Sequence, residues 1–284
     1  MTEPEVARRF GGRGIGALVG LAALLVAGGA RALGLMSGES DQPLQVDADE
    51  GIEWQQDQQI FIARGNAVAV RGDVTVRSDV LRAYYRKKPD GTSEVWRMDA
   101  EGNVVITAPT EKAYAEKAIY DVDNGILVLT GRAVRFVTPQ DEISANRQLE
   151  FWEKKGMAVA RGNAVASREG RKLRADTLTA HLRSDAAGKS RVWRVEAFDN
   201  VVVLTDTETV TSSRAVYNVD NGLATLTGAV KITRGDNQLN GCTAEVNVRS
   251  GTSLLKACAS PGPGGDPTPG RVRGLIMPGS VKKN

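Results

Sequence analysis

Short stretches in which apolar and polar residues alternate run along most of this chain. In one of them Leu81, Ala83 and Tyr85 occupy every second position between polar residues. Alternation with a period of two is typical of a β-strand that buries one face. Polar turns, such as Asp-Asn-Gly at 123–125 and again at 220–222, follow these stretches and indicate tight hairpins. The pattern therefore predicts an all-β chain built from antiparallel hairpins.

The sequence also repeats itself at an offset of 97 residues: Arg-Gly-Asn-Ala-Val at 64–68 recurs at 161–165. No insertion or deletion separates the matched segments, so turns and strands keep their lengths. Such a period predicts one elongated body of stacked units. Seven hairpin units, or about fourteen strands, fit between Gln45 and Cys258. We expect two repeats at about 45–141 and 142–238, followed by a terminal hairpin at 239–258.

A glycine or asparagine interrupts each apolar run near its middle, as at Gly65-Asn66 and Gly102-Asn103. Within a strand pattern these residues mark a bulge or a sharp bend. We interpret each of them as a corner where a strand passes from one sheet into the other. Because a bulge shifts the alternation, the inward positions beyond each corner stay ambiguous.

Composition and charge restrict the function. The chain has 284 residues, of which 41% are hydrophobic and 5% aromatic, and a net charge of +3. This is enough apolar content for a sizeable core. Lysine and arginine are interleaved with acids, so the basic patch of a nucleic-acid-binding protein is absent from the sequence.

Both termini differ from the body. Arg8, Arg9 and Arg13 precede an apolar stretch at 15–27, with Ala-Arg-Ala at 30–32. This predicts a signal peptide over 1–32 and export to the periplasm; a retained N-terminal anchor is the alternative. The Pro/Gly-rich residues 259–284 predict a flexible tail, although 271–277 allow one more short strand.

Two cysteines, Cys242 and Cys258, lie 16 residues apart. An oxidising compartment permits a disulfide, worth about 3 kcal/mol on chain-entropy grounds. Two unpaired thiols are the alternative.

The chain resembles the OstA-like (LptA) family of periplasmic lipopolysaccharide-transport proteins. The resemblance rests on the start of the body at 42–49, on the repeated strand and polar turn, and on the Gly-Asn corners. It covers 42 to about 258. It implies an elongated twisted antiparallel β-jelly roll, made of two facing sheets around an apolar hollow that is open at both ends. It also implies that copies stack end to end through their edge strands and carry lipopolysaccharide between the inner and outer membranes.

The resemblance implies further roles. The partners would be lipopolysaccharide through its lipid A, the inner- and outer-membrane transport components, and further copies of the chain. The edge-strand residues would be Leu44, Val46, Val246 and Val248. The inward side chains expected to contact lipid are Trp54, Leu81, Ala83, Tyr85, Ala118, Tyr120, Val122, Phe151, Leu178, Leu182, Tyr217 and Val219.

The sequence favours binding over catalysis. Its single histidine, His181, takes the place of Tyr84 in the other repeat, and we expect no catalytic residues, metal or cofactor. An acyl chain of ~14 carbons costs about 11 kcal/mol to expose to water, so a lipid carrier needs an apolar shelter. Three alternatives stay open: a membrane-anchored partner in the same transport system, a structural β-repeat protein without lipid, and a β-helical carbohydrate-active enzyme. Asn-Gly hairpin turns disfavour the last.

Overall fold

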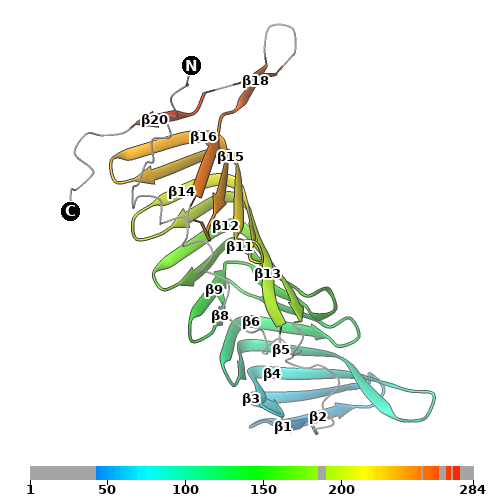
Figure 1. Cartoon of the computed structure of the whole chain (residues 1–284). Coiled ribbons are helices and arrows are strands. Elements are labelled where there is room, and N and C mark those ends of the chain that lie inside the picture. The colour runs from blue at the N-terminus through cyan, green and yellow to red at the C-terminus, as the bar shows by residue number, and fades with distance from the viewer. Residues whose placement is uncertain (1–42, 185–189, 251, 262–266, 270, 276–284) are drawn as a thin grey trace, which may run out of the picture.

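The computed structural model describes residues 43–184, 190–250, 252–261, 267–269 and 271–275. They form one long antiparallel sheet in which neighbouring strands follow each other along the chain, with the N-terminal and C-terminal strands at opposite ends of an elongated body (Figure 1). The helical part of these residues is one 3-10 turn, Glu153–Lys155. None of the described helices is long and apolar enough to cross a membrane. The predicted signal peptide at 1–32 lies outside the described residues.

The main sheet has eighteen strands. They are β1 (Gln45–Asp47), β2 (Gly51–Gln55), β3 (Ile60–Arg71), β4 (Val74–Lys87), β5 (Ser93–Ala108), β6 (Glu111–Asp121), β7 (Ile126–Thr130), β8 (Val134–Val137), β9 (Asp141–Ala145), β10 (Gln148–Trp152), β11 (Met157–Arg168), β12 (Arg171–Ser184), β13 (Ser190–Leu204), β14 (Thr209–Asn218), β15 (Leu223–Arg234), β16 (Asn237–Asn247), β17 (Thr252–Lys256) and β20 (Arg273–Leu275). Two further strands, β18 (Ala259–Pro261) and β19 (Pro267–Pro269), pair with each other.

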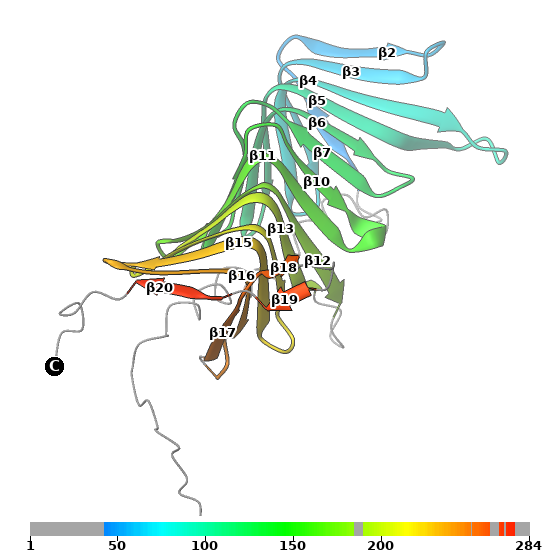
Figure 2. The same ribbon diagram turned by 90° about the horizontal axis from the view of Figure 1, so that it is seen from above.

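The long strands bend at the predicted corners. In β3 the pairing with β4 breaks between Arg64 and Ala67, where Gly65 and Asn66 have φ values of 76° and 44°. Such positive values suit glycine and asparagine. Each bent strand thus contributes to two layers, and Figure 2 shows this bend in β13 and β15. We call the layer that contains residues 60–64 the first layer and the layer that contains 67–71 the second layer.

Asparagine side chains fasten three of these corners. The Asn103 amide donates to both carboxylate oxygens of Asp79, at 3.1 and 3.0 Å. One repeat later, the Asn200 amide donates to Asp176 Oδ2 at 2.9 Å. Asn66 makes the same contact with Asp49 at 2.8 Å. At these three corners the Gly-Asn or Asp-Asn pair is therefore a bend that an aspartate of an adjacent segment holds in place.

The core lies between the layers. One cluster of buried side chains extends along the body from Ala69 to Val248, and many of its members are alanine or valine. Val104 comes from the second layer and Leu226 from the first, and both are almost fully buried. The predicted all-β, two-layered roll is confirmed. The strand count exceeds the expected fourteen because the chain breaks at some corners, as between β7 and β8 at Gly131.

The C-terminal segment departs from the prediction of a flexible tail over 259–284. β17 pairs with the first-layer part of β16, and β20 pairs with Gln238–Asn240 in its second-layer part. The excursion through β18 and β19 separates these two edge strands. A disulfide joins Cys242 to Cys258, with 4.9 Å between the Cα atoms. The short strand that the sequence allowed at 271–277 is thus present as β20, and its backbone is held by pairing with β16.

Candidate functional site

The inner faces of the two layers enclose two adjoining apolar cavities. The first, of about 170 Å³, lies within the N-terminal repeat, and the second, of about 160 Å³, lies in the middle of the body. Leu127 lines both. Side chains around the first include Val46, Ile52, Phe61, Leu81, Ala83, Met98, Ala118 and Tyr120. Side chains around the second include Leu129, Phe136, Ile143, Leu149, Phe151, Ala180, Leu182 and Val192.

Most of the side chains predicted to face inward do so, but at different depths. Leu81, Ala83, Ala118 and Tyr120 line the first cavity, and Phe151 and Leu182 line the second. Three others, Tyr85, Leu178 and Tyr217, are buried. Val122 and Val219 are partly buried and pack against the core.

Trp54 lies at the open N-terminal end of the interior, where 56% of it is exposed. Its ring stacks on Phe61 with 5.4 Å between centroids, and its indole N–H donates to the Tyr85 hydroxyl at 2.7 Å. The aromatic cluster of Trp54, Phe61 and Tyr85 therefore forms an apolar mouth at this end.

Second-layer residues of the site escaped the sequence reasoning. Phe136 and Ile143 line the second cavity from β8 and β9, opposite the predicted first-layer positions. These strands are only four and five residues long and follow a break in the chain, so alternation gives a weak signal. Leu127 and Leu129 were detectable, because they alternate directly after the Asp-Asn-Gly turn.

Charged groups border the interior. Burial raises the pKa of the Glu153 carboxyl, partly offset by a hydrogen bond from the Tyr120 hydroxyl at 3.4 Å. Burial and the nearby Glu153 charge raise the pKa of Tyr120 in turn. In the second layer, Arg168 and Asp141 form a buried ion pair at 2.5 Å. Polar groups thus lie at the edges of the apolar cavities.

Two buried carboxylates of the first layer, one of which lines the second cavity, have pKa values that arginine hydrogen bonds lower. Desolvation would raise the pKa of Glu150, but hydrogen bonds led by that from Arg161, at 2.6 Å, lower it. The pKa of Glu196 is lowered in the same way, chiefly by a hydrogen bond from Arg214 at 2.7 Å. His181 lies 3.4 Å from Glu196 and lines neither cavity. Among the described residues, no three His, Cys, Asp or Glu side chains are placed to hold a metal ion.

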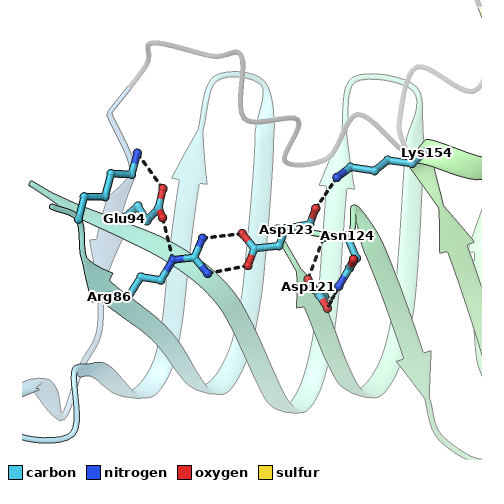
Figure 3. A network of polar contacts seen from close by, with 7 residues as sticks. Arg86, Glu94, Asp121, Asp123, Asn124 and Lys154 are labelled. Atoms are coloured by element: carbon cyan, nitrogen blue, oxygen red, sulfur yellow. Dashed lines mark hydrogen bonds and ion pairs between the residues drawn. The ribbon is translucent and has the colours of Figure 1, made fainter. Parts of the chain in front are cut away.

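A network of polar contacts ties successive first-layer hairpins together (Figure 3). Arg86 bonds Glu94 in its own hairpin and Asp123 in the next turn, each at 2.7 Å. Lys154, one hairpin further, donates to the backbone oxygen of Asp123. Arg183 repeats the contact of Arg86 by bonding Asp220 at 2.8 Å. These contacts set the spacing of the hairpins along the border of the cavities.

The structure places the predicted edge residues at the edge of the sheet at the N-terminal end only. Leu44 and Val46 lie beside the N-terminal edge and line the first cavity. Val246 needs correction: it pairs with Ala224 on one side and Ser253 on the other, so β16 is an inner strand. Val248 follows β16 and is buried. The C-terminal edge is formed instead by the short strands β17 and β20, which pair with β16.

A family model described as "LptA/(LptD N-terminal domain) LPS transport protein" matches residues 45–149 and again 142–252. The two matches start 97 residues apart, which is the offset of the sequence repeat. The chain belongs to this family. Its role is accordingly in lipopolysaccharide transport. No curated protein matches the chain.

Among solved structures, a match is "LptH, the LptA homologous periplasmic component of the conserved lipopolysaccharide transport device from Pseudomonas aeruginosa". It is 18% identical, covers 49% of this chain and 95% of its own, and gives a TM-score of 0.38.

Proposed function

We propose that this chain is a periplasmic carrier that shelters the acyl chains of lipid A between its two layers and helps to bridge the inner and outer membranes. The observation that carries the proposal is the pair of apolar cavities that share Leu127. Each buried methylene contributes about 0.8 kcal/mol, so a few methylenes per cavity offset much of the cost of exposing an acyl chain. The residues act by exclusion of water, and the lipid leaves unaltered.

Two further features support the periplasmic setting. The disulfide between Cys242 and Cys258 is of the kind that persists in oxidising compartments. The basic and apolar N-terminal residues have the order of an export signal. Bridging is supported by the two ends of the sheet, because the pairing partner of β1 and β2 within the described residues is β3 alone. Such an open edge is a template for another strand.

Photocrosslinking from the cavities tests lipid binding. A photoreactive amino acid at Leu81 or Phe151 is expected to label with lipid A, because these side chains line the first and second cavity. The same probe at Lys112, an exposed residue of β6, is expected to label at background level. The measurement is the fraction of chain that migrates with labelled lipopolysaccharide.

Equal labelling at Lys112 and Phe151 would mean that lipid adheres to the surface, and the carrier function would then be rejected. No labelling at any position would favour a structural β-repeat protein.

A further inference from the structure

The edge strands at the two ends of the sheet have equal lengths and run in opposite directions. At the N-terminal end, β2 supplies five residues to the first layer and β1 three residues to the second. At the C-terminal end, β17 supplies five to the first layer and β20 three to the second. β2 runs away from the corner towards a hairpin turn, whereas β17 runs from a hairpin turn towards the corner. In the second layer, β1 runs towards the corner and β20 runs away from it. A copy placed on the end of another would add antiparallel strands in both layers.

Cross-strand pairing fixes how such a junction is aligned. In the second layer one row of paired residues passes through every strand, starting at Asp47 in β1 and ending at Arg273 in β20. A first-layer row likewise starts at Ile52 and ends at Leu255, and both of these side chains face the interior. If the rows continue across a junction, Asp47 of one copy lies opposite Arg273 of the other.

The side chains at the two ends are complementary. Residues 43–55 contain four acids and no lysine or arginine, namely Asp47, Asp49, Glu50 and Glu53. The C-terminal edge strands and their flanks, 252–258 and 271–275, contain three basic residues and no acid, namely Lys256, Arg271 and Arg273. Exposed apolar side chains also gather at both ends, with Ile52 and Trp54 at one and Leu254 and Leu275 at the other.

We propose that the tail strand β20 is half of the C-terminal docking face, and that it receives β1 of a second copy with Asp47 opposite Arg273. This rests on the end-to-end stacking in the proposed function and specifies its register. The tail lies beyond residue 252, where the family match ends. The disulfide joins the residue segment after β17 to the corner of β16. It thereby restrains β17 at the point where the first-layer edge meets the second-layer edge. Without β20, the second-layer edge would be Gln238–Asn240 of β16, one strand short of the first layer.

Charge reversal tests this register. Asp47→Arg places two arginines opposite each other at the junction, and Arg273→Asp places two aspartates there. The self-association constant of each variant is therefore expected to fall at least about fivefold below that of the wild type. An equimolar mixture of the two restores an opposite pair at every junction when copies alternate, and its association should return to near the wild-type level. Sedimentation of the purified full chain at rising concentration measures both effects.

Lys231→Asp is the matched control, because Lys231 lies exposed in the same row on β15, a strand that is paired on both sides and lies two strands inside the C-terminal edge. It changes the net charge as much as Arg273→Asp but should leave association unchanged. Failure of the mixture to recover would overturn the register, as would a wild-type chain that stays monomeric throughout.

Removing residues 271–284 tests the role of β20 itself. We expect the shortened chain to associate more weakly. Unchanged association would show that β20 does not take part, and stronger association would show that β20 caps the edge; either result overturns the proposal. Lipid labelling from Phe151 in the same variants is read separately: its retention shows that the carrier function stands whether or not copies stack.

Discussion

Replacing Ala180 with Trp is expected to abolish most lipid binding while the chain still folds. Ala180 lies on β12, opposite Ala158 and Val195 of its neighbours, and lines the second cavity. An indole side chain there would occupy space that we assign to acyl carbons. Exclusion of about four methylenes removes roughly 3 kcal/mol of binding energy, a loss of affinity of about a hundredfold. Displacement of a fluorescent acyl probe measures the loss.

The control for this variant is Lys112→Trp, which adds the same side chain to the outer face of β6. It should bind the probe like the wild type. Overpacking lowers the free energy of unfolding by about 1 to 3 kcal/mol, so urea denaturation of Ala180→Trp should show a shifted but cooperative transition. Wild-type affinity in a folded Ala180→Trp variant would exclude the second cavity as the lipid site.

The first layer was the most predictable part of the interior. Period-two alternation identified Leu81 and Tyr120 because each lies in an unbroken run between a turn and a corner. Beyond the corner the bulge shifts the register by one residue, and a shift of one moves every side chain to the other face. Val104 keeps the alternation of Met98 and Ala100 across its corner and is almost fully buried, whereas the shift falls on the partner strand β4, in which Val76 and Leu81 both line the first cavity although five positions separate them.

The ends of the sheet were less predictable, for a different reason. β17 and β20 are short, and the strand that covers the second-layer edge lies far along the chain behind β18 and β19. Local alternation carries no information about pairing across such an excursion. Whether the space between the layers is filled was also beyond the sequence. It depends on where small residues lie side by side on the inner face of a layer, as Ala158 and Ala180 do on neighbouring strands at the second cavity.

Replacing Gly156 with Ala is expected to destabilise the chain far more than the same change at Gly235. Both glycines have left-handed backbones, with φ of 55° and 53°. A Cβ at Gly235 would meet nothing within 4 Å, whereas a Cβ at Gly156 would clash with the backbone oxygen of Leu182. The left-handed conformation alone costs about 1 to 2 kcal/mol for a residue other than glycine. Gly235→Ala should show only that cost.

At Gly156 the obstructing atom belongs to the backbone, so β12 or the turn that precedes β11 must move. Such a shift disturbs the hydrogen bond from Leu182 N–H to the Gly156 oxygen, which measures 2.6 Å. We therefore expect Gly156→Ala to lower the free energy of unfolding by about 3 kcal/mol or more, as measured by urea denaturation. Because Leu182 lines the second cavity, this variant should also bind the acyl probe more weakly. Equal destabilisation by the two alanines would mean that the turn yields freely and that the position of Leu182 does not depend on Gly156.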